Sequence, residues 1–186
     1  HYLHRRQRQM CIRDSQKISR GIRERVLEHT INHGGYLSQA CSSAEIFSIL
    51  YNKSMKLGPS EGLFSTHKFE GTPSVNNPHP QKGFLYNGAK NPDLDRFFLS
   101  PSHYALTLYA ALIETKRLND KCLKEFNKDG SVLDMIGSEH SPGHETNGGS
   151  FGQTISQAAG VAWARRRKKE KGLVWLFLSD GEFQDC

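Results

Sequence analysis

The residues best suited to bind a metal ion and a phosphate follow directly after an apolar stretch. Val174–Leu178 carries no charge, which is typical of a strand buried on both faces of a parallel sheet. Ser179-Asp180-Gly181-Glu182 comes next. Open α/β sheets bind ligands at the carboxyl ends of their strands, and a glycine there lets a phosphate approach the backbone closely. We therefore expect Asp180 to bind Mg²⁺, which takes one or two protein carboxylates and completes its shell with water and phosphate oxygens.

A histidine follows a second predicted strand in the same way. Asp95–Ser100 is short and apolar, and it runs into Pro101-Ser102-His103. The apolar spacing from Ala105 to Ile113 then predicts a helix. A strand, a turn and a helix in this order place His103 at the carboxyl edge of the sheet. From these residues alone, a histidine buried in the turn is the simpler interpretation.

Two histidines and two glutamates lie close together between Ser138 and Glu145, which invites a zinc or hydrolase interpretation. His140 and His144 have the i, i+4 spacing of metal ligands on a helix. Pro142-Gly143 lies between them and breaks a helix, so the two rings would not converge on one ion. We therefore do not expect a zinc site here.

Three features in succession resemble the thiamine diphosphate domain of transketolases: the segment Pro142–Gln153, a helix rich in small residues, and a strand followed by Ser-Asp-Gly-Glu-Phe-Gln-Asp. The family pattern in this order is Pro-Gly-x-Glu-x-Thr-x-Gly-x-Leu-Gly-Gln, a helix, a strand and Gly-Asp-Gly-x-x-Gln-Glu-Gly. The stretch Asp95–Tyr109 also resembles the family's Asp-Arg-Phe-x-Leu-Ser-x-Gly-His-x-x-x-x-Leu-Tyr. The resemblance covers residues 16–186, nearly the whole sequence.

The resemblance implies how this edge of the sheet would hold the cofactor. Asp180 is expected to bind the metal ion, with the Gly181 N–H and His103 directed toward the diphosphate. Gly149 and Phe151 match positions whose backbone meets the aminopyrimidine ring, where glycine permits a close approach.

The resemblance also implies residues on the substrate side and at a dimer interface. Tyr36 stands where the family has a histidine, and a phenol is a poor base near neutral pH. His140 is a candidate for the family's substrate-facing histidine, with Glu139 as the competing match. Tyr36, His103 and His140 are therefore the candidate catalytic residues. Asp185 matches a glutamate that links the two cofactors of a dimer.

The implied activity is transfer of a two-carbon ketol unit between phosphorylated sugars, with thiamine diphosphate and Mg²⁺, or Ca²⁺ or Mn²⁺, as cofactors. The cofactor would do the difficult step, while the protein orients and shields it. A second metal ligand, an asparagine, and a pyrimidine-side domain are expected beyond Cys186 or in another subunit. We therefore expect a homodimer or heterotetramer, and a chain that is truncated at its C-terminus and inactive alone.

Two other functions stay open. The alpha subunit of a 2-oxo acid dehydrogenase uses the same cofactor and a Gly-Asp-Gly pattern, although the Ser-x-x-His-x-x-x-x-Leu-Tyr and Gln-Asp elements favour a transketolase. A non-catalytic α/β binding module would show no dependence on the cofactor. The three functions therefore differ in their cofactor requirement and in the domains that accompany this one.

An α/β domain with a mostly parallel sheet and helices on both faces would position these residues. Helical spacing from Ser15 predicts a first helix that ends at His33-Gly34-Gly35. Ser42-Ser43-Ala44-Glu45 has the pattern of a capping box and predicts the start of a second helix. Residues 54–93 are predicted to form a long loop beside the site, and Gln153–Ala164 a helix. The apolar residues expected to face the core from the first two helices are Ile18, Ile22, Val26, Ile31, Ile46, Phe47, Ile49 and Leu50.

The composition is ordinary for a single domain without a membrane span. The 186 residues are 36% hydrophobic, with a mean hydropathy of −0.62. No apolar run approaches the ~20 residues of a membrane helix, and no secretory signal pattern is present. The four cysteines are widely spaced and are expected to be reduced. We therefore expect a cytoplasmic protein without a membrane partner.

The net charge of +6 does not indicate a nucleic-acid partner, because it is concentrated in two places. Residues 1–15 carry half of it and lack an apolar period, and they resemble translated adapter sequence. We expect them to be a non-native or disordered arm, with residues 16–186 forming the domain. The cluster Arg165–Lys171 is expected to be a solvated helix end, where cations favour the helix dipole.

Overall fold

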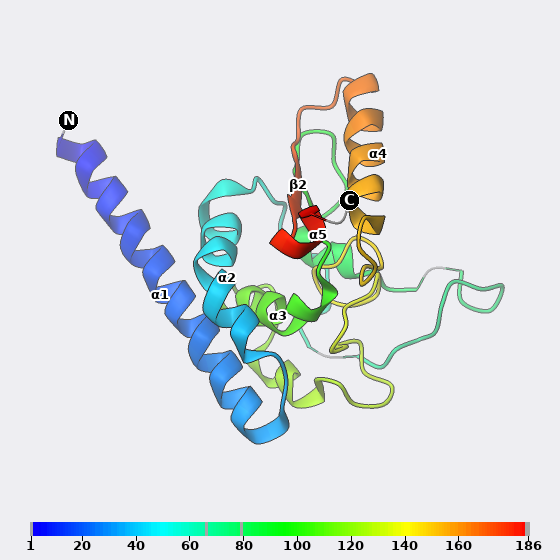
Figure 1. The fold of residues 1–186 in the computed structure, drawn as a ribbon. Helices are drawn as coiled ribbons and strands as arrows, with labels where there is room; N and C mark the ends of the chain where they lie inside the picture. The colour runs from blue at the N-terminus through cyan, green and yellow to red at the C-terminus, as the bar shows by residue number, and fades with distance from the viewer. Residues whose placement is uncertain (1, 66, 79, 185–186) are drawn as a thin grey trace.

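One layer of the molecule consists of three α-helices that contact one another. The computed structural model describes residues 2–65, 67–78 and 80–184, with side chains from Ile12 onward. The three helices are α1 (Tyr2–His33), α2 (Leu37–Ile49) and α3 (Ala105–Glu114). Figure 1 shows them on one side of the molecule, with α4 (Gln153–Arg167) on the other. A small sheet lies between the two sides.

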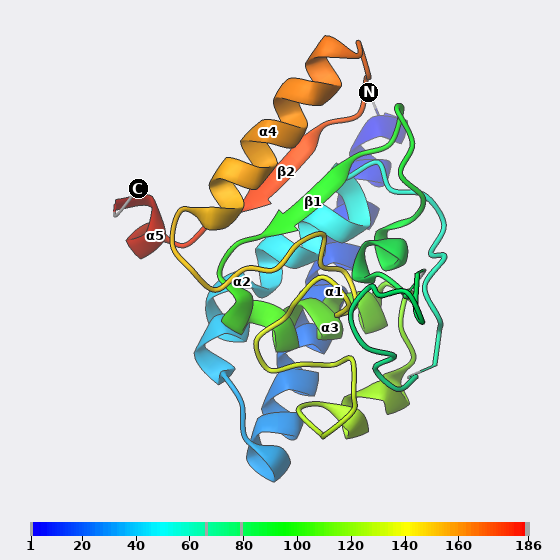
Figure 2. The same ribbon diagram turned by 90° about the vertical axis from the view of Figure 1, so that its right-hand side faces the viewer.

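This sheet has two parallel strands within the described part of the chain, β1 (Arg96–Leu99) and β2 (Val174–Phe177). The two strands lie side by side, and each residue of β1 pairs with one of β2, from Arg96 with Val174 to Leu99 with Phe177. The Ser100 N–H extends the ladder by donating to the Phe177 carbonyl at 3.1 Å. Figure 2 shows α4 beside the strands and the helical layer behind them. The predicted α/β class is confirmed in coarse form, as a helix-rich chain around a small parallel sheet. A domain dominated by its sheet is not confirmed, since these residues contain two strands.

The side chains of the strands alternate between two covered faces. Phe97 and Phe177 face the helical layer, where the ring of Phe47 lies 6.2 Å and 5.0 Å from theirs, centroid to centroid. Phe98 points to the opposite face by alternation and is also fully buried, under α4, which contacts both strands. β2, in contrast, is half-buried along its length. The strand predicted to be buried on both faces was Val174–Leu178, so that prediction is wrong for β2; the more deeply buried strand is β1.

Asp95 ties the two strands together at their amino ends. Its carboxylate accepts hydrogen bonds from the Lys56 N–H at 2.9 Å and from the Leu173 N–H and Trp175 Nε1 at 2.8 Å each. Burial alone would raise the pKa of Asp95, but these three hydrogen bonds more than offset it and the pKa is lowered. The charged form of Asp95 therefore fixes where β2 meets β1.

Arg165 differs from the rest of its basic cluster. Its side chain is 8% exposed, donates to three backbone carbonyls in residues 91–94, and lies 3.1 Å from the Glu170 carboxylate. Arg166–Lys169 is exposed, as predicted. The solvated helix end is therefore confirmed for those four residues and wrong for Arg165, whose planar donors match a set of carbonyls.

The first helix begins at Tyr2, well before the predicted start at Ser15. Its backbone is helical through residues expected to be an arm, because their arginines and glutamines are good helix formers even without an apolar period. The Ser15 carbonyl accepts a hydrogen bond at 2.6 Å from the buried hydroxyl of Ser48. The helix ends at His33 as predicted, and Gly34 follows with a φ of 80°.

The capping box predicted for the second helix is wrong. α2 begins at Leu37, so Ser42-Ser43-Ala44-Glu45 lies inside it. Ser43 donates to the carbonyl of Gln39, and Glu45 forms an ion pair with Arg23 of α1. These side chains therefore bind within and between helices rather than at a helix start.

The buried faces of these helices are narrower than predicted. Three of the predicted core residues are exposed: Ile31 (74%), Ile46 (48%) and Ile49 (46%). Ile22, Val26 and Phe47 are fully buried, as predicted. His29 is buried in α1 on the turn that was assigned to Ile31.

The long predicted loop is largely irregular. It holds the 3₁₀ turn η2 (Gly83–Asn87), and Asn87 accepts from the Tyr51 hydroxyl and donates to the Gly143 carbonyl, both at 3.0 Å. The loop therefore packs against the glycine-rich segment, as predicted. The remaining elements are η1 (Leu50–Ser54), η3 (Ser102–Tyr104), η4 (Asp120–Glu125) and α5 (Asp180–Gln184). None of the described helices is both long and apolar enough to cross a membrane.

Candidate active site

Three segments converge where the two parallel strands end. β1 runs into η3, β2 runs into α5, and the glycine-rich loop enters α4 at Gln153. Figure 2 shows both strands pointing toward the end of the molecule where α4 begins and α5 lies. Polar groups carried by these segments therefore share one edge of the sheet, as the strand–turn–helix order predicted.

The glycine-rich loop packs directly against the end of β1. A Cβ at Gly148 would overlap the Ser102 hydroxyl and lie 2.8 Å from the Ser100 carbonyl, so a larger residue does not fit. Gly149 and Gly152 have φ values of 101° and 78°, in the region that favours glycine. A Cβ at Gly149 would meet nothing within 3.7 Å, since its nearest neighbour lies at 3.8 Å. The tight position is thus Gly148, which the sequence analysis did not single out.

Glu182 is the carboxylate that turns into this edge. It is 1% exposed, and its Oε1 accepts hydrogen bonds from the Ser100 hydroxyl and from the Gly152 N–H, the latter at 3.2 Å. Its own N–H donates to the Ser179 hydroxyl at 3.2 Å. Sequence reasoning missed Glu182, although Ser179-x-x-Glu182 has the spacing of a capping box and signals a helix start at this place.

Asp180 and Gly181 are more open than Glu182. Asp180 is the first residue of α5 and is exposed, and a Cβ added at Gly181 would meet nothing within 4 Å. Both follow β2 directly, where the sequence placed them. Asp185 lies outside the described residues.

Tyr36 and His103 are brought together at this end of the molecule. Their ring centroids are 5.8 Å apart with the planes at 68°, an edge-to-face contact. Tyr36 lies between α1 and α2, whereas His103 belongs to the turn after β1. Partial burial lowers the pKa of His103 and so favours its neutral form. The pair therefore combines the neutral imidazole of His103 with the phenol of Tyr36, which is 41% exposed.

His140 lies in a separate polar cluster. Its Nε2 is 2.7 Å from Asp134 Oδ2, which also accepts from the hydroxyls of Ser138 and Ser141 at 3.1 Å each. Burial alone would raise the pKa of Asp134, but these hydrogen bonds more than offset it and the pKa is lowered. Phe69 of the long loop lies against the His140 ring, with centroids 4.2 Å apart. His140 is therefore held by the loop on one side and a carboxylate on the other.

The glycine-rich loop is also anchored at Glu145, whose side chain is 2% exposed. Arg96 donates two hydrogen bonds of 2.5 Å to its carboxylate, and Lys90 lies 3.9 Å away. The bidentate pair joins the loop to β1. Phe151, further along the glycine-rich loop, is 60% exposed.

Several buried polar atoms at the edge have no hydrogen-bond partner in the described part of the chain. These atoms are Ser102 Oγ, Thr154 Oγ1 and Glu182 Oε2. Buried polar atoms are normally paired, so they mark a place where a polar ligand or water would bind. With the tight glycine loop and the start of α4, a 15-residue helix, they fit a diphosphate and a divalent cation.

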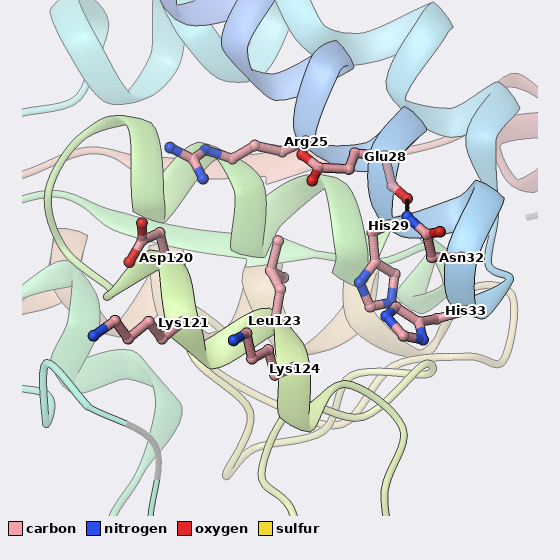
Figure 3. A pocket seen from close by; sticks show the side chains of 9 residues that line it. All are labelled: Arg25, Glu28, His29, Asn32, His33, Asp120, Lys121, Leu123 and Lys124. Carbon is pink, nitrogen blue, oxygen red and sulfur yellow. Dashed lines mark hydrogen bonds between the residues drawn. The ribbon is translucent and has the colours of Figure 1, made fainter.

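A pocket of about 390 Å³ lies elsewhere, between α1 and η4 (Figure 3). Figure 3 shows His29 and His33 side by side on α1, and Lys121 and Lys124 on η4. None of its lining residues belongs to the strand edge described above. Charges of both signs line it, so the pocket does not favour one class of ligand.

Comparison with known proteins identifies the family to which the strand edge belongs. The family model described as "Transketolase, thiamine diphosphate binding domain" matches residues 82–172. That match includes His103, His140, Gly149 and Phe151, and it ends before Asp180.

Individual relatives extend the likeness over most of the chain. A putative uncharacterized transketolase family protein y4mO of Sinorhizobium fredii is 30% identical over 167 residues, which cover 87% of this chain and 50% of that protein. Human transketolase-like protein 2 is 29% identical over 149 residues, or 80% of this chain and 20% of that protein. Human transketolase is 26% identical over 152 residues, or 81% and 20%. The chain thus spans about half of the bacterial relative and about a fifth of the human ones.

The matched segment carries the glycine-rich loop, the turn with His103 and helix α4, which are the parts that build the strand edge. The family was expected from the same residues. The chain belongs to the transketolase family, as a form of its N-terminal thiamine diphosphate-binding domain.

Proposed function

We propose that this chain binds thiamine diphosphate together with a divalent cation at the carboxyl edge of its sheet, and that it serves the transfer of a two-carbon ketol unit between phosphorylated sugars. The observation that supports this most is the packing of the glycine-rich loop onto the end of β1, where Gly148 meets Ser102. This contact brings the backbone of the glycine-rich loop to the carboxyl end of β1, next to the turn that carries His103. A polyanionic diphosphate suits such an edge, since amides and a cation can offset its charge.

Each residue at the edge has a separate role in this proposal. Asp180 is the metal ligand for Mg²⁺, with Ca²⁺ or Mn²⁺ as substitutes, because it is exposed at the strand end and free to meet an ion. The Gly181 N–H and His103 bind the diphosphate. Gly149 and Phe151 offer backbone to the aminopyrimidine ring, and Asp185 links two cofactor sites.

The substrate-side residues form hydrogen bonds to the sugar substrate and orient it. Thiamine diphosphate supplies a stabilised carbanion when it is bound. His103, with its lowered pKa, is neutral near pH 7 and can donate or accept a hydrogen bond. Tyr36 lies against it and can orient a sugar hydroxyl, but it cannot act as the base that a histidine would provide. His140 faces the sugar phosphate from the loop side, held in place by Asp134.

The proposed partners follow from the cofactor. Sugar phosphates are the substrates, and a pyrimidine-side domain or second subunit completes the site, in a homodimer or heterotetramer. Exposed apolar side chains at this end of the molecule, Phe151 and Phe183 at 60% and 73%, are consistent with a covering surface there.

Calorimetric titration tests the cofactor assignment. Thiamine diphosphate would be titrated into the 186-residue chain with Mg²⁺ and again with the cation removed by a chelator. We expect binding in the first case and a loss of at least tenfold in affinity, about 1.4 kcal/mol, in the second. Oxythiamine diphosphate, which keeps the diphosphate, should bind with the same cation dependence. Binding that does not depend on the cation would contradict the proposed site.

A further inference from the structure

We infer that Glu182 is a positioning residue of this edge: its carboxylate clamps the glycine-rich loop and the end of β1 to the segment that follows β2. Glu182 was given no role in the sequence analysis, because it falls on an unspecified position of the quoted family pattern, and it lies beyond the family match, which ends at residue 172. The cofactor-binding part of this inference rests on the proposed function. Its structural part does not.

The clamp joins three segments that are distant in the sequence. Glu182 Oε1 accepts from the Ser100 hydroxyl, 82 residues earlier, and from the Gly152 N–H, 30 residues earlier. Ser100 directly follows β1, Gly152 is the N-cap of α4, and Glu182 belongs to α5. One oxygen atom therefore holds together the ends of all three segments that build the edge.

Local backbone geometry holds both Gly152 and Glu182 in position. Gly152 has a φ of 78°, a conformation that glycine adopts without strain, and this presents its N–H to the carboxylate. The negative charge also lies at the start of α4, where the helix dipole favours it. On the other side, the Ser179 hydroxyl accepts from the Glu182 N–H and fixes the first turn of α5.

Burial strengthens the hydrogen bonds of the Glu182 carboxylate. Glu182 and Ser100 are 1% and 2% exposed, so water does not compete for their hydrogen bond. A buried carboxylate without partners is unfavourable, and here one oxygen has two donors. The second oxygen, Oε2, is also buried and has no partner among the described residues. The carboxylate therefore has one oxygen that holds the protein and one that remains available at the edge.

The position of the clamp explains why it would matter for the cofactor. Ser100 lies two residues before Ser102 and three before His103, and Glu182 lies two after Asp180. A fixed link from Ser100 through Glu182 to Gly152 sets the spacing between the turn with His103, the loop with Gly149 and the start of α5. Releasing it would let the three segments separate without changing the identity of any candidate ligand.

Two substitutions of Glu182 separate the effect of its hydrogen-bond acceptor from the effect of its charge. Glu182→Ala removes the clamp, whereas Glu182→Gln keeps an oxygen at the same place but removes the charge. Glu24→Ala, on the exposed surface of α1, is the control. Amide hydrogen exchange of Gly152 is measured by NMR in the cofactor-free protein, and thiamine diphosphate affinity by calorimetry with Mg²⁺.

We expect Glu182→Ala to increase the exchange rate of the Gly152 amide about tenfold and to weaken thiamine diphosphate binding about tenfold. Each change corresponds to roughly 1.4 kcal/mol. Glu182→Gln should stay within about threefold of the parent in both, since a neutral amide oxygen still accepts hydrogen bonds. If Glu182→Ala does not fold, Ser100→Ala replaces it, because it removes one donor and should speed Gly152 exchange by a smaller factor.

Two results would overturn the proposal. Unchanged Gly152 exchange in Glu182→Ala, or in Ser100→Ala where that variant replaces it, would show that the carboxylate does not hold the loop. Equal loss of affinity in Glu182→Gln and Glu182→Ala, with parental exchange in Glu182→Gln, would show that the charge acts on the cation and that the clamp is not the cause. If the parent binds no thiamine diphosphate, the proposed function fails, and the exchange data alone decide on the clamp.

Discussion

Tyr36 and His103 meet edge to face, with ring centroids 5.8 Å apart, although they belong to segments separated by α2 and β1. This contact places the Tyr36 phenol next to the histidine that we propose for the diphosphate. The proposed function gives these two neighbours separate roles, Tyr36 toward the sugar and His103 toward the cofactor.

The first prediction follows from that separation. In the active protein, Tyr36→His should change the preference among donor sugars, because it restores a base, and should leave thiamine diphosphate affinity within about threefold of the parent. Tyr36→Phe, which keeps the ring contact with His103 and loses the hydroxyl, is the matched control. Donor preference is measured as a ratio of kcat/KM values and affinity by calorimetry. A large change in cofactor affinity with an unaltered donor ratio would remove Tyr36 from the substrate side.

The second prediction concerns Asp180. Asp180→Asn should weaken Mg²⁺-dependent binding of thiamine diphosphate by at least tenfold, about 1.4 kcal/mol, because it removes the anionic ligand at the strand end. Asp129→Asn, an exposed aspartate in a distant turn, should have no effect. Titration with and without Mg²⁺ measures both variants. Equal affinity and equal Mg²⁺ dependence in parent and Asp180→Asn would exclude Asp180 as the ligand.

The third prediction concerns the pH dependence of stability. His144 is 1% exposed, and burial lowers its pKa from 6.5 to about 4. Below pH 6.5 the unfolded chain binds a proton there that the folded chain does not, so stability is lost as the pH falls toward 4. The gap between 6.5 and about 4 corresponds to a loss of roughly 3 kcal/mol from this group.

His144→Gln should flatten this dependence, whereas His33→Gln, at the exposed end of α1, should not. Urea unfolding at several pH values between 7 and 4.5 measures the free energy of unfolding. The same slope in parent and His144→Gln would mean that another group causes the acid sensitivity.

The fourth prediction concerns the amino end of the sheet. Asp95→Ala should reduce the free energy of unfolding by about 3 kcal/mol, because it leaves the N–H groups of Lys56, Leu173 and Trp175 without their acceptor. Asp93→Ala, exposed and 3.9 Å from Lys171, should cost less than about 1 kcal/mol. Denaturant titration followed by tryptophan fluorescence is the measurement. Similar losses in the two variants would contradict the role of Asp95.

The fifth prediction concerns the N-terminal arm. Deleting residues 1–14 should leave stability and cofactor affinity unchanged, within about 1 kcal/mol. Deleting residues 1–15 should cost about 1 kcal/mol more, because the buried Ser48 hydroxyl loses the Ser15 carbonyl. Thermal unfolding of both shortened chains compares them. A large loss with the shorter deletion would show that the first turns of α1 belong to the fold.

The sequence predicted the parts of the fold that local patterns determine. β1, the turn with His103, α3 and the end of α1 at Gly34 were found from apolar spacing and turn residues. The start of α2 was not, because Ser42-Ser43-Ala44-Glu45 matches a capping box by spacing, while Glu45 is held by Arg23 on another helix. Burial of His29 in place of Ile31 likewise depends on what packs against the helix.

The same distinction applies to the candidate site. His103 and Asp180 were singled out because each comes shortly after a predicted strand, and the structure places them in η3 and α5, the elements that follow β1 and β2. Gly148 and Glu182 were missed because their importance depends on contacts with Ser102 and Ser100, residues that are distant in the sequence. Periodicity describes one segment at a time, so it does not report which segments meet.

The parallel pairing of β1 with β2 also has a consequence for how the protein folds. Asp95 and Leu173 are joined by a hydrogen bond although they lie 78 residues apart in the chain. Closing so long a loop costs entropy before any contact repays it, whereas α1 and α2 are adjacent in the sequence and can associate early. β2, α5 and the strand edge should therefore assemble in the last steps of folding, and the rate at which the protein becomes able to bind its ligand would report that late step.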